Sequence, residues 1–184
     1  MKTAEDVQAF ISTRPHIVRL LEAVERLQLP DAWIAAGLIR NAVWNALYGF
    51  PSDGIATRDI DVAYFDPAAT SKAADLAIEA RLKSEMGDMP WEVRNQARMH
   101  ADNGDSPYLS TEDAIRCWPE TATALAARVD RGKVQMIAPY GVADLLALIV
   151  RPTPIFLKKT HVYRARLATK DWKARWPKLT FLDS

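Results

Sequence analysis

The sequence is poor in the residues on which several common kinds of site depend. It has one cysteine, Cys117, in 184 residues, which excludes a disulfide framework and a metal site built from several thiolates. Its three histidines, His16, His100 and His161, lack the spacing of metal ligands, which argues against a zinc site. There is no Gly-x-Ser-x-Gly nucleophile elbow, and the stretch 49–54 has P-loop glycine spacing without the Lys-Ser/Thr that must follow it.

Long apolar runs are absent as well. The most apolar stretch, residues 142–150, contains Asp144 and is too short to cross a bilayer. The first residues include Lys2, Glu5 and Asp6 and have no apolar core of the signal-peptide type. These features favour a cytoplasmic protein with no membrane partner.

Charge is balanced overall and uneven locally. The chain has 24 Lys and Arg against 23 Asp and Glu, and 49% of its residues are hydrophobic, as in a globular protein of one domain over 1–184. Residues 151–178 hold nine Lys or Arg and one acid, Asp171. We expect 151–184 to be a basic C-terminal helical extension, which is either a solvated helix face or a surface that contacts a polyanion.

Hydrophobic spacing predicts helices that alternate with short strands. Helices are predicted before and after Pro15, from Leu38 to Leu47, and over 73–86, 111–117 and 142–150, with one or two more after Pro154. Strands are predicted over 33–36, 60–65, 91–99 and 134–138. This order predicts an α/β or α+β fold in which helices cover a sheet.

The strongest chemical signal is the pair Asp59 and Asp61 around Ile60. Strand periodicity places both carboxylates on one face, with Ile60 and Val62 on the opposite, core-facing side. Two carboxylates this close repel each other unless a cation lies between them, and oxygen ligands of this kind suit Mg²⁺ or Mn²⁺. An isolated Asp-x-Asp is common, however, and is also compatible with a loop end and a surface ion pair.

The surroundings of the pair strengthen the functional interpretation. Gly37 stands between a predicted strand and a helix, where backbone amides can approach a phosphate. Glu92, on the next predicted strand, shares a face with Arg94 and offers a third carboxylate, as a two-metal phosphoryl-transfer site requires.

The order of Gly37, Asp59, Asp61 and Glu92 resembles the DNA polymerase β-like nucleotidyltransferase superfamily. A closer resemblance is to a bacterial family of small nucleotidyltransferase-like proteins. The segments that carry it are 33–44, 59–66, 91–100, 118–121, 138–144 and 170–177, which together span nearly the whole chain.

This resemblance implies a mixed sheet with helices packed mainly on one side and extra C-terminal helices. It implies that Asp59 and Asp61 bind Mg²⁺ or Mn²⁺, and that Glu92 is a third metal ligand that helps to activate an acceptor hydroxyl. The reaction would be attack on the α-phosphate of an NTP with release of pyrophosphate. The acceptor, whether a protein, an RNA or a small molecule, stays open.

The sequence departs from the superfamily at the presumed phosphate site. Leu38 follows Gly37 where Ser or Gly is usual, so we expect Arg40, Asn41 and Arg94 to contact the phosphates in its place. The spacing from Gly37 to Asp59 is long, which predicts an inserted loop over the cleft at 49–58. These departures leave open a catalytically inactive module that binds a nucleotide or a protein.

Overall fold

The computed structural model describes residues 1–51 and 57–183, so the middle of the predicted 49–58 loop lies outside the described residues. Five strands form the central sheet in the order β3-β2-β1-β4-β5. Their bounds are β1 (Trp33–Ala35), β2 (Ile60–Tyr64), β3 (Trp91–Asn95), β4 (Ala126–Asp130) and β5 (Lys133–Ile137). β2 and β3 run parallel and the other neighbours run antiparallel. The sheet is therefore mixed, as the resemblance implies.

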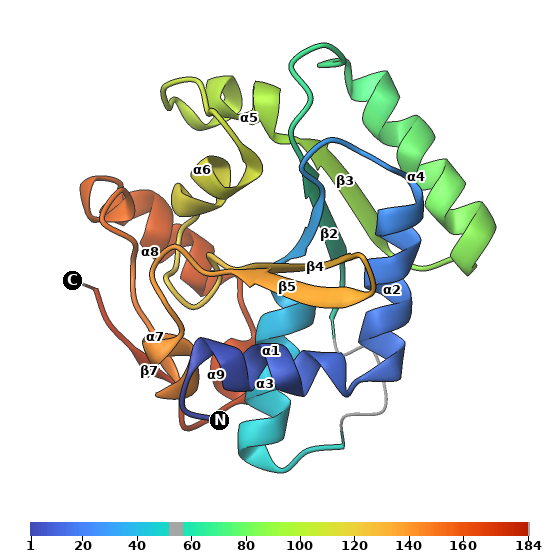
Figure 1. Cartoon of the computed structure of the whole chain (residues 1–184). Coiled ribbons are helices and arrows are strands. Elements are labelled where there is room, and N and C mark those ends of the chain that lie inside the picture. The colour runs from blue at the N-terminus through green and yellow to red at the C-terminus, as the bar shows by residue number, and fades with distance from the viewer. Residues whose placement is uncertain (52–56, 184) are drawn as a thin grey trace.

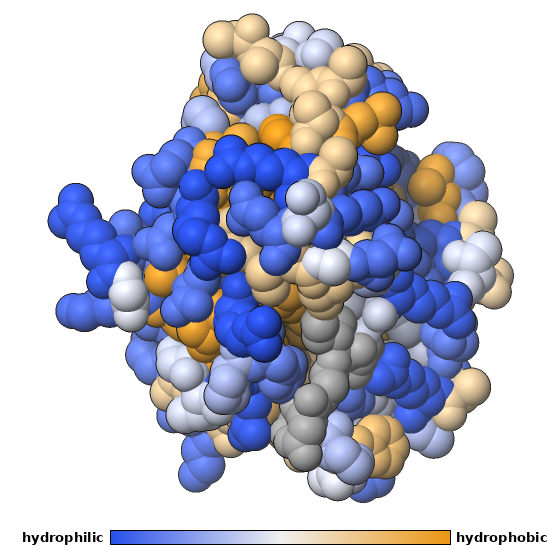
Figure 2. Space-filling view, turned by 90° about the vertical axis from the view of Figure 1, so that its right-hand side faces the viewer, coloured by the Kyte–Doolittle hydropathy of each residue, from blue (hydrophilic) through white to orange (hydrophobic). Residues whose placement is uncertain are grey.

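Four helices bury one face of this sheet. They are α1 (Ala4–Ser12), α2 (Pro15–Arg26), α3 (Gly37–Tyr48) and α4 (Lys72–Met86). A capping box of Thr3 and Asp6 starts α1, and Pro15 occupies the first turn of α2, where its missing N–H costs nothing. Seen from the side of α2 and α4, the surface is mainly hydrophilic with smaller hydrophobic areas between (Figure 2). These helices thus have one face in the core and one in solvent.

Three helices stand on the other side of the sheet from α2 and α4 (Figure 1). They are α5 (Gln96–Asn103), α6 (Thr111–Arg116) and α8 (Thr160–Ala168). The hydrophobic cluster on this side is small and includes Trp33, Ala35 and Ile115. Most of the core therefore lies under α1 to α4, as expected, and the second face has room for a cavity.

The C-terminal segment packs back onto the rest of the chain. Its elements are α7 (Ala143–Leu146), β6 (Ile149–Val150), the 3₁₀ helix η1 (Phe156–Lys158), α8, α9 (Trp172–Arg175) and β7 (Thr180–Phe181). Trp172 and Trp176 meet Trp44 of α3 edge-on, with ring centroids 5.7 and 5.0 Å apart. These tryptophans are core residues, as expected, and they fix α9 beside α3.

The predicted strand over 91–99 is too long. β3 ends at Asn95, whose side chain caps α5 by accepting a hydrogen bond from the N–H of Ala97 at 3.1 Å. The same amide group donates to the carbonyl oxygens of Asp66 and Ala69, at 2.7 and 3.0 Å. Asn95 therefore ends the strand and starts a helix, a role in which asparagine is favoured.

The predicted helix over 142–150 is wrong in its second half. Only Ala143–Leu146 is helical, because Leu148 has a left-handed φ of 58° and the chain then enters β6. β4 and β7 were not predicted, and β4 begins with two alanines, which do not signal a strand. Within the described residues, no helix is long and apolar enough to cross a membrane.

Candidate active site

Asp59 and Asp61 stand side by side at the start of β2. Ile60 and Val62 are 0% and 1% exposed in the main core, so strand alternation turns Asp61 to the opposite face. Asp59 lies just before the strand, on the same side, and Glu92 is the neighbour of Asp61 across the parallel pair of β2 and β3. The register thus brings the three predicted acids to one face of the sheet.

The turn from β1 to α3 is shaped around Asp59. Ala36 caps α3 with φ +47°, which is unfavourable for a residue with a Cβ. Thr57 donates its hydroxyl to the backbone oxygen of Asp59 at 2.8 Å, and the same hydroxyl is 3.3 Å from the carboxylate. A Cβ on Gly37 would lie 2.8 Å from Oγ1 of Thr57 and 3.6 Å from Oδ1 of Asp59. Gly37 is therefore needed for the close approach of Thr57, whereas the sequence predicted this glycine for the approach of a phosphate.

We predict that Gly37→Ala weakens the binding of a divalent metal and NTP by about tenfold to a hundredfold, as loss of an outer support of a metal ligand does. The added methyl group would displace Thr57 and with it the carboxylate of Asp59. Calorimetric titration of both proteins measures the change. A double-mutant cycle with Thr57→Ala is the control: the methyl group should have little effect once the hydroxyl is removed, and an equal effect in both backgrounds would contradict the prediction.

The side chain of Leu38 cannot donate a hydrogen bond to a phosphate. Its side chain is 3% exposed and belongs to the main hydrophobic core, so the first turn of α3 presents backbone amides there and no hydroxyl.

Arg40 and Asn41 are both buried, each 5% exposed. Arg40 donates to Oδ1 of Asn41 at 2.9 Å and to Oγ1 of Thr123 at 2.9 Å. Its guanidinium lies 4.3 Å from the ring centroid of Trp172 and 5.0 Å from that of Trp44. Arg40 is thus a rigid cation behind the aspartates, held by stacking and hydrogen bonds.

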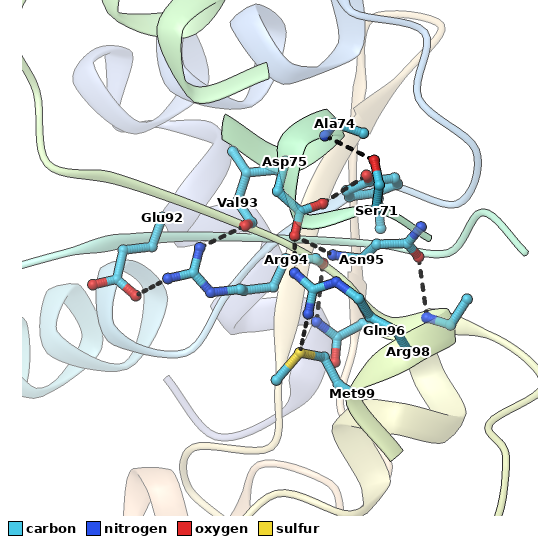
Figure 3. Close-up of polar contacts among 12 residues, drawn as sticks. Ser71, Ala74, Asp75, Glu92, Val93, Arg94, Asn95, Gln96, Arg98 and Met99 are labelled. Atoms are coloured by element: carbon cyan, nitrogen blue, oxygen red, sulfur yellow. Dashed lines mark hydrogen bonds and ion pairs between the residues drawn. The ribbon is translucent and has the colours of Figure 1, made fainter. Parts of the chain in front are cut away.

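Glu92 and Arg94 lie together on β3 (Figure 3). Glu92 is exposed, and its Oε2 is 3.5 Å from Nη2 of Arg94. Arg94 also contacts Oε1 of Glu79 at 3.0 Å and the carbonyl oxygen of Val93 at 2.7 Å. Glu79 of α4 and Glu92 of β3 therefore already pair with Arg94. A phosphate that binds Arg94 would have to share it with these two carboxylates.

The charges around Asp61 favour a bound cation. The pKa of Asp61 is raised to about 7, first by burial and then by the carboxylates of Asp59 and Glu92, while Arg40 and Arg166 oppose the shift. A divalent cation would relieve the repulsion among these carboxylates, and their oxygens are ligands that Mg²⁺ and Mn²⁺ accept. The donor set therefore fits such an ion.

Glu92, the predicted third metal ligand, is not gathered with the two aspartates. In the part of the chain that the structure describes, no three His, Cys, Asp or Glu side chains are gathered so that they could hold a metal. Glu92 faces Arg94 and would have to turn to join the aspartates. Asp59 and Asp61, completed by water and substrate oxygens, are the ligands that the geometry offers.

A cavity of about 490 Å³ opens beside Asp61. It lies between the sheet and the helices of its second face, and its lining includes Ala36, Asp61, Arg94, Gln96, Met99, Asn103, Asp105, Cys117, Trp118, Thr123, Phe156, Lys159 and Arg166. Its size is that of a small-molecule site. Trp118 and Arg166 were not singled out as site residues, because nothing in their sequence neighbourhood indicates that they reach the aspartates.

Arg166 of α8 is anchored at this cavity by a buried acid. Its Nε lies 2.7 Å from Oε1 of Glu120 and its Nη2 lies 3.4 Å from Oε2, and Glu120 is 0% exposed. A two-point contact of this kind fixes the guanidinium plane. The basic C-terminal segment thus contributes a fixed positive charge beside Asp61.

Other basic residues of this segment are also engaged. Arg151 pairs with Asp144, Lys159 with Asp105 and Arg164 with Asp183. The one acid of the segment, Asp171, pairs with Arg58. Part of the local charge excess therefore serves internal contacts.

Comparison with known proteins agrees with this geometry. A family model described as nucleotidyltransferase matches residues 22–181. An NMR structure described as a CCA-adding enzyme head domain is 33% identical, with a TM-score of 0.89, and the match covers 100% of this chain and 98% of that one. No curated protein sequence matches the chain.

Two longer enzymes share the fold at low identity. The CCA-adding enzyme of Thermotoga maritima, complexed with tRNA, is 14% identical with a TM-score of 0.56 over 98% of this chain and 42% of that one. The Bacillus stearothermophilus CCA-adding enzyme in complex with CTP is 16% identical with a TM-score of 0.53, over 84% of this chain and 38% of that one. The chain thus spans less than half of each, and the likeness to them is one of fold.

The family model covers most of the chain, and the similar head domain matches it from end to end. The chain therefore belongs to the nucleotidyltransferase family.

Proposed function

We propose that this protein transfers a nucleotide from an NTP to an acceptor hydroxyl in a reaction that requires Mg²⁺ or Mn²⁺. The observation that carries the proposal is the placement of Asp59 and Asp61 on one sheet face, with Asp61 in the lining of a cavity of about 490 Å³. Membership of the nucleotidyltransferase family supports it. When bound between the two aspartates, the cation would supply charge stabilisation for the phosphates.

The proposed step is a displacement at the α-phosphorus. The acceptor oxygen forms a bond to that phosphorus, the bond to the oxygen that bridges the α- and β-phosphates breaks, and pyrophosphate leaves with the bridging oxygen. The hydroxyl proton passes to Glu92, the exposed acid of the three, and then to water. Fixed positive charges from Arg40 and Arg166 stabilise the negative charge that builds up, without needing to reorganise.

We place the nucleoside of the NTP in the larger cavity. Trp118 and Phe156 offer apolar surface there, and Asn103 and Asp105 offer polar groups, the usual mixture in a site for a small molecule. Arg94 remains a proposed phosphate contact at its edge.

The acceptor that we favour is an RNA end. The basic segment 151–178 lies along the cavity through Lys159 and Arg166, and structures that share the fold are described in complexes with tRNA and with CTP. RNA contacts made by Lys and Arg should weaken steeply as salt rises.

The test uses NTPs labelled at the α-phosphate, Mg²⁺ and an RNA with a free 3′ hydroxyl. The same RNA with a 3′ phosphate is the matched control. We expect labelled product only with the free end, accompanied by pyrophosphate. Binding of Mg²⁺-NTP without product from RNA, protein or small-alcohol acceptors would instead support a catalytically inactive nucleotide-binding module.

A further inference from the structure

A second, smaller cavity of about 100 Å³ lies on the Asp59 side of the aspartate pair. Its lining includes Arg40, Arg58, Asp59, Lys170, Asp171 and Trp172. It shares none of its lining residues with the larger cavity, which contains Asp61. The two aspartates therefore face two different cavities from one short stretch of chain.

Positive charge gathers around the smaller cavity. Arg58 and Asp171 form an ion pair of 2.7 Å with each other, and Arg40 and Lys170 lie in the same lining as Asp59. Among the described residues, no carboxylate lies within ion-pairing distance of the Lys170 ammonium.

Lys170 lies near other cations, which repel its ammonium group. Its ammonium lies 5.9 Å from the ring centroid of Trp172, on whose ring the Arg40 guanidinium also stacks. Burial lowers the pKa of Lys170, and the positive charges of Arg166 and Arg40 lower it further. Such a cluster of cations at one cavity is the arrangement that an anion stabilises.

The size and chemistry of the cavity indicate phosphate groups. A volume of about 100 Å³ is well below the roughly 300–1,000 Å³ of sites that enclose a drug-sized ligand, whereas it can admit compact anionic groups.

We propose that the β- and γ-phosphates of the NTP, and the pyrophosphate product, occupy this smaller cavity with Lys170 as their principal side-chain ligand. The inference rests on the proposed function, since it requires the α-phosphate at the aspartate pair. The nucleotide then runs from the larger cavity past Asp61 and Asp59 to Lys170.

The experiment measures binding of pyrophosphate, of NTP and of the matching nucleoside monophosphate in the presence of Mg²⁺. The variant is Lys170→Gln, and the control is Lys133→Gln, which removes the same charge from an exposed position at the β4–β5 turn. We expect Lys170→Gln to weaken pyrophosphate and NTP binding by about tenfold or more, the effect of losing a hydrogen bond to a charged group. Monophosphate binding should stay unchanged, and Lys133→Gln should behave as the wild type.

The single cysteine supplies a second readout. Cys117 lines the larger cavity and a further cavity of about 540 Å³ beside Tyr108, but not the smaller one, so NTP should slow its reaction with a neutral thiol reagent without abolishing it, and pyrophosphate should not slow it. Saturating NTP should protect Cys117 equally in Lys170→Gln.

The outcomes separate the two proposals. Failure of the wild type to bind Mg²⁺-NTP would overturn the proposed function, and this inference with it. Normal NTP binding with unchanged pyrophosphate affinity in Lys170→Gln would overturn the inference alone. Protection of Cys117 by pyrophosphate would also overturn it, because the anion would then occupy the larger cavity.

Discussion

Replacing Asp61 with Asn is expected to abolish catalysis and to make the metal-free protein more stable at pH 8. Transfer should fall by about 10²–10³-fold or more, the scale of losing one electrostatic catalytic group. The free energy of unfolding should rise by on the order of 2–4 kcal/mol, since the pKa of Asp61 is raised from 3.8 to about 7 and each unit corresponds to about 1.4 kcal/mol.

The sign of the stability effect depends on pH. A carboxyl group whose pKa is raised by folding binds its proton more tightly in the folded state, so stability falls as pH rises between about 4 and 7. Above about pH 7 the full penalty of the charged Asp61 is present, and below about pH 4 it is gone. The difference between wild type and Asp61→Asn should therefore vanish toward pH 4.

Urea unfolding with chelator present, at several values of pH, measures this difference. Asp88→Asn is the matched control, because Asp88 is exposed and its replacement should leave stability unchanged at every pH. Adding Mg²⁺ should raise the stability of the wild type and leave Asp61→Asn nearly unaffected. A variant that is less stable than wild type at pH 8 would contradict the electrostatic account of this site.

The second large effect is expected at Arg166. Replacing it with Met leaves Glu120, which is 0% exposed, without its ion-pair partner. Breaking a buried pair from one side costs about 3–5 kcal/mol, so Arg166→Met should lower the free energy of unfolding by that amount. It should also weaken NTP binding, because Arg166 lines the larger cavity.

Two controls separate lost charge from lost packing. Arg164→Met removes an exposed pair with Asp183 and should change stability by less than about 1 kcal/mol. The double variant Glu120→Leu/Arg166→Met should recover most of the loss, since apolar replacement of a whole buried pair is often neutral or stabilising. Equal costs for Arg164→Met and Arg166→Met would show that Glu120 does not depend on its partner.

Much of the fold follows from local sequence signals. Periodic apolar residues placed α1 to α4 and β1 to β3, because burial against one sheet face imposes that spacing. The predictions were wrong where a single side chain or backbone angle determines where a strand or helix ends. Asn95 ends β3 through its own hydrogen bonds, and Leu148 breaks a helix by adopting a positive φ. Neither effect produces a periodic pattern in the sequence from which it could be predicted.

The sequence predicts the acids of the site better than the cations. Asp59, Asp61 and Glu92 come from two neighbouring strands, whose register follows from their alternation. Arg166 reaches the site because it pairs with Glu120, and Lys170 because Trp172 and Trp176 pack on Trp44 of α3. Neither long-range contact has a local signal. The basic character of residues 151–178 follows from the sequence alone. Which of these residues form ion pairs and which line a cavity depends on tertiary contacts.

The most direct test of the central claim is calorimetric titration of NTP into the wild type and into Asp59→Asn/Asp61→Asn, with and without Mg²⁺. We expect the wild type to bind NTP only when Mg²⁺ is present. The double variant should stay folded, as judged by its urea transition, and should show no Mg²⁺-dependent binding. Equal binding by both proteins, or binding by the wild type that ignores Mg²⁺, would contradict the assignment of the aspartates as the metal site.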